Sequence, residues 1–141
     1  MSQRRRLLGV DPGDVRIGLA VSDPDRKIAS PLTTYVHRKA EQDAKFFRET
    51  VEQEEIAGIV VGLAVHAHGE GRQAQKARRF GAWLTQVTGL PVAYWDESFS
   101  TVVAETVLWD SSLTHKRRRA LRDRLAAQVM LQTYLDAMSR A

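Results

Sequence analysis

The stretch GVDPGDVRIGLAVSD, residues 9–23, decides the fold on which the rest of the chain builds. An apolar run leads to one acidic residue, Asp11, a Pro-Gly-Asp turn follows, and a second apolar run ends at Asp23. Two apolar runs around so short a turn are typical of two antiparallel strands. A carboxylate at the end of a buried strand is costly unless something pairs with it. The stretch therefore predicts a hairpin whose first strand carries Asp11 into a polar site.

The hydrophobic pattern outside this stretch alternates between strands and helices. We expect strands over 5–11, 16–22, 27–36, 56–65 and 91–97, and helices over 40–55, 71–87, 100–110 and 117–138. Pro31 places the third strand at an edge or at a bulge, whereas the continuous apolar run 56–65 is typical of a strand buried on both faces. Three antiparallel strands followed by two parallel ones predict an α/β fold with a mixed five-stranded sheet.

Composition narrows the class of protein. The chain of 141 residues suits one domain spanning 1–141, and 43% hydrophobic residues are enough for a core. Cysteine is absent, which excludes a disulfide framework and thiolate chemistry. No apolar run approaches the roughly 20 residues that span a bilayer. The basic start MSQRRRLLGV lacks the long apolar segment of a secretion signal, so we expect a cytoplasmic protein.

Positive charge gathers in three runs. The net charge is +4, and the runs are RRR at 4–6, KARR at 76–79 and HKRRRALRDR at 115–124. Each run alone fits a solvated surface. Together they favour nucleic acid as the partner, because clustered Lys and Arg side chains neutralise phosphates.

Acidic residues follow the predicted strands. Asp11 ends the first strand, Asp96 and Glu97 end the strand at 91–97, and Asp123 lies near the start of the last helix. Strand ends meet at one edge of an α/β sheet, where such folds place their sites. Converging carboxylates repel each other unless a divalent cation joins them, and Mg²⁺ binds few carboxylates while keeping water and phosphate oxygens. We therefore predict a site for two Mg²⁺ or Mn²⁺ ions that hydrolyses phosphodiester bonds without a covalent enzyme intermediate.

Four segments resemble the motifs of the YqgF family, the pre-16S rRNA nucleases related to Holliday junction resolvases. The segments are GVDPGDVRIGLAVSD, IVVGLAV, DESFST and DRLAAQVMLQTYLD, and the resemblance extends from about Leu7 to Asp136. It implies a ribonuclease H-like fold and a bacterial, metal-dependent nuclease that acts on the 5′ end of precursor 16S rRNA. It also implies Asp11, Glu97 and Asp123 as the catalytic metal ligands.

The chain departs from the family pattern in three motifs. The second motif continues as AVHAHGE at 64–70, with His66 and His68 in place of a proline-leucine-asparagine pattern. The third motif has Ser98 where an arginine is usual, and the first has Asp14 where a small or hydroxyl residue is usual. The two histidines either bind a transition metal, stabilise a leaving group or lie in a solvated loop.

Several charged residues allow two interpretations. Arg16 binds substrate phosphate or neutralises the acids, and we expect the phosphate backbone to be positioned by Lys116, Arg117, Arg118 and Arg119. Asp11 could instead cap its turn, and Asp96 could replace Glu97, because alternation points only one of the two toward a metal. Asp123 could pair with an arginine on its own helix.

The aromatic residues are expected in the core rather than as platforms for bases. This expectation covers Phe46, Phe47, Trp83 and Trp95, together with the aliphatic Leu84.

Two further function classes stay open at this stage. One is a non-catalytic module that binds nucleic acid or ribosomal particles, and the other is a Holliday junction resolvase acting on branched DNA. A resolvase has to act as a dimer to cut two strands, whereas a processing nuclease can be a monomer or a homodimer. The first motif also resembles the phosphate loop of actin-like ATPases and sugar kinases, but those need a second domain that 141 residues do not supply.

Overall fold

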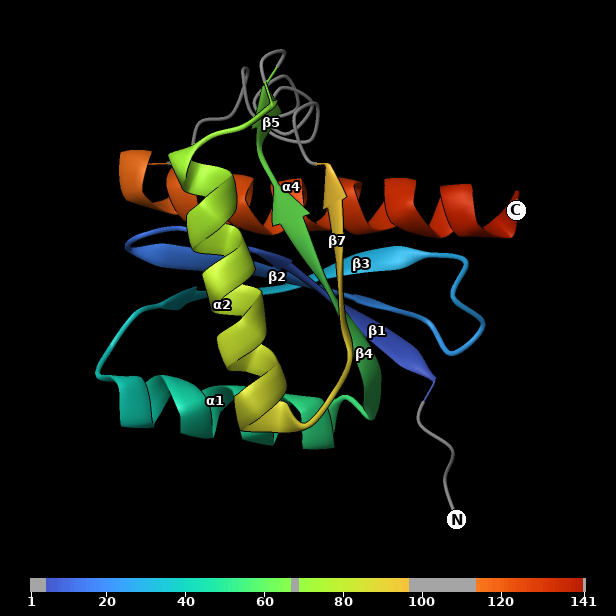
Figure 1. The fold of residues 1–141 in the computed structure, drawn as a ribbon, viewed down its shortest axis with the longest axis horizontal. Coiled ribbons are helices and arrows are strands. Elements are labelled where there is room, and N and C mark those ends of the chain that lie inside the picture. The colour runs from blue at the N-terminus through green and yellow to red at the C-terminus, as the bar shows by residue number, and fades with distance from the viewer. Residues whose placement is uncertain (1–4, 67–68, 97–113, 141) are drawn as a thin grey trace.

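Five strands form one mixed sheet in the order β3-β2-β1-β4-β7 (Figure 1). The computed structural model describes residues 5–66, 69–96 and 114–140. The sheet contains β1 (Arg6–Asp11), β2 (Arg16–Ser22), β3 (Ala29–Val36), β4 (Ile56–Leu63) and β7 (Val92–Asp96). The described helices are α1 (Ala40–Gln53), α2 (Arg72–Thr88) and α4 (His115–Ser139). No helix in these ranges is both long enough and apolar enough to cross a membrane.

The strand directions confirm the predicted mixed sheet. β1 pairs antiparallel with β2, and β2 antiparallel with β3, whereas β4 runs parallel to β1 and β7 parallel to β4. β3 is an edge strand, and its register with β2 shifts where Ala20 faces Pro31. Pro31 therefore lies both on an edge and at a bulge, as its missing N–H requires.

Most predicted boundaries differ from the structure by one or two residues, and one predicted helix is not described. The strand expected over 56–65 ends at Leu63, and a separate small sheet of β5 (Val65–His66) and β6 (Gly69–Glu70) follows it. The last helix begins at His115, two residues before its expected start, because the side chain of Thr114 caps it by accepting from the N–H of Arg117. The helix expected over 100–110 lies outside the described residues.

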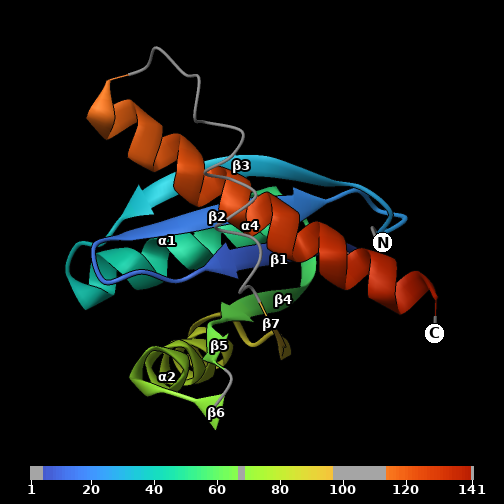
Figure 2. The same ribbon diagram turned by 90° about the horizontal axis from the view of Figure 1, so that it is seen from above.

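Helices cover both faces of the sheet. In Figure 1, α2 passes in front of the sheet and α4 crosses behind it, and Figure 2 shows α4 crossing over β1 and β2. Alternation along β4 sends Ile59 and Val61 toward α1 and α2 and sends Val60 toward α4. All three side chains are buried, which explains the continuous apolar run of this strand.

The aromatic residues lie in or against these cores, as predicted. Phe47 and Leu84 are fully buried between the sheet, α1 and α2, and Phe46 and Trp83 pack against them. Trp95 packs on the opposite face against the core under α4, where its indole N–H donates to the hydroxyl of Thr133 over 2.9 Å.

Two glycines let α4 approach the sheet closely. A Cβ atom built at Gly18 would lie only 2.5 Å from the carbonyl carbon of Asp123, and one built at Gly9 would lie 2.9 Å from Cβ of Leu131. Glycine inside a strand is typical of such a close approach. Gly9 and Gly18 therefore fix how α4 crosses β1 and β2.

Candidate active site

Asp11 and Asp123 come together although they are far apart in the sequence. Asp11 is the last residue of β1 and lies directly opposite Gly18 in β2. The backbone of Asp123 lies against Gly18, and Gly9, two residues before Asp11, also faces α4. Residues two apart on a strand, and residues directly opposite on paired strands, share a face of the sheet. The two acids therefore lie on the same face, at the end of β1.

Arg16 is joined to this acidic pair from the start of β2. Its Nε atom donates to Oδ2 of Asp123 over 2.9 Å, and the two side chains are 25% and 19% exposed. An ion pair that is largely shielded from water holds its two partners in a defined geometry. Arg16 thus supplies positive charge beside one of the acids, which is the neutralising role that the sequence allowed for it.

The third acid of the predicted site is only partly covered by the structure. On β7, the hydroxyl of Tyr94 donates to the carbonyl of Arg78 on α2, whereas Trp95 packs toward α4. Alternation places the exposed Asp96 on the Tyr94 side of the strand, away from the face that carries Asp11. Glu97, Ser98 and His68 lie outside the described residues. Within 5–66, 69–96 and 114–140, no group of three acidic or histidine side chains is close enough to hold a metal ion.

The basic run occupies the first two turns of α4. Lys116 and Arg117 are exposed, and Arg118 and Arg119 are half-buried. Positive charge near a helix N-terminus opposes the helix dipole, so helix stability gives no reason for four cations there. The run precedes Asp123 on the same helix.

The second acid of the opening stretch, Asp23, has a structural role. Its carboxylate accepts hydrogen bonds from the backbone N–H groups of Lys27 and Ile28, at 2.7 and 3.0 Å. The bonds from Ile28 and Lys27 lower the pKa of Asp23 below its usual value. Asp23 therefore closes the turn between β2 and β3. It follows the end of β2 that lies away from Asp11.

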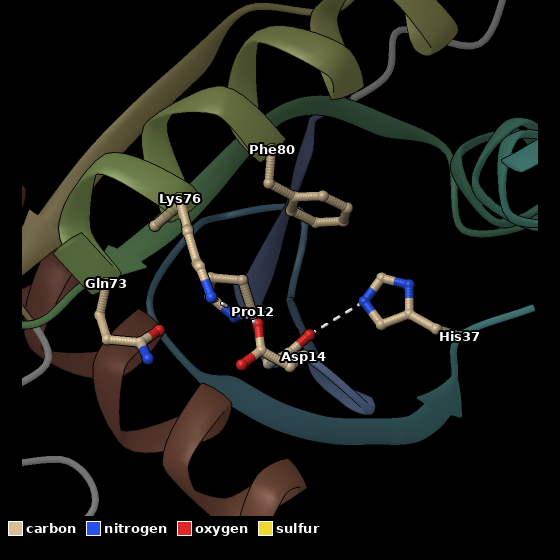
Figure 3. A pocket seen from close by; sticks show the side chains of 8 residues that line it. Pro12, Asp14, His37, Gln73, Lys76 and Phe80 are labelled. Atoms are coloured by element: carbon tan, nitrogen blue, oxygen red, sulfur yellow. Dashed lines mark hydrogen bonds and ion pairs between the residues drawn. The ribbon is translucent and has the colours of Figure 1, made fainter.

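A pocket of about 220 Å³ opens behind the turn between β1 and β2 (Figure 3). Its wall includes Pro12, Gly13 and Asp14 of the turn, His37 after β3, and Gln73, Lys76, Ala77 and Phe80 of α2. Nε2 of His37 lies 2.9 Å from the carbonyl oxygen of Gly13, and Nδ1 lies 3.0 Å from Oδ2 of Asp43. The sequence patterns did not single out His37, because its partners come from separate elements and share no motif.

A mixed five-stranded sheet with an acid ending its first strand and another acid on its last helix defines the class of protein. This is the ribonuclease H-like fold, as expected. The chain belongs to the RuvX family, whose model is described as a Holliday junction resolvase and matches residues 5–137.

Curated relatives are similar over nearly the whole chain. A protein of Rhodopirellula baltica named "Putative pre-16S rRNA nuclease" is 42% identical over 133 residues, covering 94% of this chain and 77% of the relative. A protein of Ruegeria pomeroyi with the same name is 44% identical over 133 residues, covering 94% of this chain and 86% of the relative.

Solved resolvase structures share the fold. The RuvC protein of Thermus thermophilus in complex with a Holliday junction substrate matches with a TM-score of 0.59 and 18% identity, covering 96% of both chains. The fowlpox virus resolvase in complex with Holliday junction DNA matches with a TM-score of 0.57 and 7% identity, covering 94% of this chain and 98% of that one.

Proposed function

We propose that this chain is a metal-dependent nuclease that hydrolyses phosphodiester bonds during 5′-end processing of precursor 16S rRNA. The names of the curated relatives support the RNA substrate, and membership of the RuvX family supports phosphodiester cleavage. We further propose that it acts as one domain, in the cytoplasm, where ribosomal precursors are found.

The observation that carries this proposal is the approach of Asp123 to the end of β1. Gly18 lies opposite Asp11 in the sheet and against the backbone of Asp123, so one small residue brings both acids to the same place. A purely structural pair of carboxylates on one face would repel each other. A cation bound between the two carboxylates would remove this repulsion.

Magnesium or manganese fits this donor set. Carboxylate oxygens are the hard ligands that both ions take, and we propose Asp11, Asp123 and Glu97 as the ligands. Alternation turns the exposed Asp96 to the Tyr94 side of β7, away from the face of Asp11, and this disfavours Asp96 as a ligand. When bound, a pair of divalent cations supplies an activated water and stabilises the leaving oxygen.

The remaining residues position acids and substrate. Arg16 holds the carboxylate of Asp123 through its 2.9 Å ion pair and adds positive charge beside the scissile phosphate. The exposed side chains of the basic run, Lys116 and Arg117 above all, contact phosphates of the strand as it crosses the start of α4.

The test is cleavage of a precursor 16S rRNA fragment that keeps its 5′ extension. Purified protein is incubated with Mg²⁺, Mn²⁺ or chelator, and new 5′ ends are mapped by sequencing. We expect metal-dependent shortening by the wild type and by Asp25→Asn, a matched loss of one exposed acid in the β2–β3 turn, but none by Asp11→Asn.

The same protein is tested in parallel on a four-way DNA junction. Paired cuts in the junction without cleavage of the RNA would assign the second candidate function, Holliday junction resolution, which the description of the family favours. Binding of RNA without cleavage under any metal condition would leave the non-catalytic module.

A further inference from the structure

His37 joins the turn that follows Asp11 to a carboxylate on the first helix. One ring nitrogen, Nδ1, lies 3.0 Å from Oδ2 of Asp43, and the other, Nε2, lies 2.9 Å from the carbonyl oxygen of Gly13. Figure 3 shows the ring reaching across the pocket to this turn. Both partners are oxygen atoms. If neither oxygen carries a hydrogen, both ring nitrogens have to be the donors of these hydrogen bonds.

Asp43 is fixed as an acceptor. Its side chain is 8% exposed and accepts from the hydroxyl of Tyr35 over 2.6 Å and from the N–H of Arg38 over 2.9 Å. Burial by itself raises the pKa of Asp43, but the hydrogen bonds from Tyr35, His37 and Arg38 outweigh it and lower the pKa. Burial and the bond to Asp43 raise the pKa of Tyr35 to about 12, so its hydroxyl stays a donor. Asp43 is therefore a charged carboxylate that requires Nδ1 to donate.

The carbonyl of Gly13 is also an acceptor, so Nε2 has to donate as well. A neutral imidazole carries one N–H and can satisfy only one of the two oxygens, whereas the doubly protonated ring satisfies both. Two more charged groups face the pocket, Asp14 from the turn and Lys76 from α2, and they pair with each other over 3.5 Å. From the helix side the ring of Phe80 meets the histidine edge-on.

The turn is locally stiff, so it moves as one unit with the end of β1. Gly13 lies so close to the carbonyl of Arg16 that no side chain fits there, and Pro12 fixes the backbone angle just after Asp11. A second bond, from the N–H of His37 to the carbonyl of Val15 over 2.9 Å, joins the same two segments. Movement of the Gly13 carbonyl is therefore passed through a stiff connection to the end of β1.

We propose that His37, in its doubly protonated form, is a positioning residue that holds the turn after Asp11 against α1 and so fixes the direction of the Asp11 carboxylate. The proposal rests on the proposed function of Asp11 as a ligand for the catalytic metal. His37 itself contacts neither substrate nor metal in this role. Loss of its second proton releases one of the two oxygens and loosens the turn.

The kinetic test compares His37→Ala, His37→Gln and Asp43→Asn with the control Lys45→Gln. The control removes a positive charge from α1 two residues after Asp43, at a side chain that is 74% exposed and pairs with Glu49 over 3.9 Å. At about pH 6, His37→Ala should lower kcat on the precursor RNA about 10-fold to 100-fold with little change in KM, because a misplacement near 1 Å costs that much. Lys45→Gln should match the wild type.

The glutamine variant separates positioning from packing. Its amide can donate to the carbonyl of Gly13 without titrating, so it should recover most of the activity that alanine loses. Failure of glutamine to recover activity, or a loss confined to KM, would overturn the proposal.

A second measurement does not depend on catalysis. Long-range ¹H–¹⁵N NMR of the histidine rings in the full chain distinguishes the doubly protonated ring from each neutral tautomer. We expect signals of two ring N–H groups for His37, one donating to Asp43 and one to the carbonyl of Gly13. A single neutral tautomer would exclude the bridge. If the wild type cleaves no substrate but the ring is doubly protonated, the proposed function fails and the positioning role fails with it, while the bridge itself stands.

Discussion

Replacing Gly18 by alanine should separate the two acids of the site without touching either of them. The new Cβ would lie 2.5 Å from the carbonyl carbon of Asp123. Carbon atoms rest about 3.5 Å apart or more, so α4 has to move outward by about 1 Å at this point. The atom in the way belongs to a helix backbone and not to the end of a flexible side chain, and rotation of a side chain therefore cannot relieve the clash.

The expected magnitudes follow from this displacement. Overpacking of a well-filled interface costs about 1–3 kcal/mol of folding free energy, which for a chain of this size lowers the melting temperature by about 3–10 °C. A shift of about 1 Å between catalytic groups lowers the rate by about 100-fold. Gly18→Ala should therefore lose far more activity at a temperature where it is fully folded than its stability change explains.

The assay is single-turnover cleavage of the precursor RNA at 25 °C, alongside thermal melts. The control is Gly58→Ala, the same change on β4, where the nearest atom is the flexible end of Leu7 at 3.3 Å. That variant should keep wild-type cleavage and change stability little. Full cleavage by folded Gly18→Ala would refute the reasoning, because the distance between Asp123 and the end of β1 would then not matter.

Three further predictions test other parts of the site and fold. Asp11→Asn should abolish cleavage and should leave the metal-free protein at least as stable as the wild type. It should also reduce the rise in melting temperature that magnesium causes. If the variant is much less stable than the wild type in chelator, Asp11 is a turn cap and not a metal ligand. Neutralising 116–119 should flatten the plot of log affinity for RNA against log salt by about 0.7 per lost phosphate contact, and an unchanged slope would make the run a solvated face. Because the pKa of Asp43 is lowered, its hydrogen bonds stabilise the fold above the unfolded value near 4, and this is lost as the pH falls through the lower folded value. Urea unfolding of Asp43→Asn should show a flatter loss of stability in acid, and a wild-type slope would contradict this.

The hairpin and the sheet could be predicted because their signals are local. Two continuous apolar runs on either side of a short turn favour antiparallel pairing, and Pro31 lacks the N–H that a central strand would need. The continuous run in β4 predicted burial on both faces for the same reason, since helices cover both sides of a strand at the centre of the sheet.

The parts that escaped prediction depend on contacts between distant segments. The hydrogen bonds of His37 join the turn after β1, the end of β3 and the start of α1, and no spacing along the sequence encodes that meeting. The early end of β4 has a similar origin, because residues 65 and 66 pair with 69 and 70 and leave the main sheet. The periodicity of apolar residues predicts that a segment is a strand, but it does not predict with which strand that segment pairs.

One signal for the site was present in the sequence, and it consists of glycines and not of acids. Gly9 and Gly18 interrupt strands that are otherwise built from bulky apolar residues, and such interruptions indicate that another backbone comes close. In a hairpin whose turn lies between Asp11 and Arg16, Gly18 lies opposite Asp11, and Gly9 shares the face of Asp11 by alternation. The two glycines thus mark which face of the sheet a helix backbone approaches, and at which end of β1. Because the residue of α4 that meets Gly18 is Asp123, the spacing of small residues in the first two strands selects the acid on the last helix as the partner of Asp11.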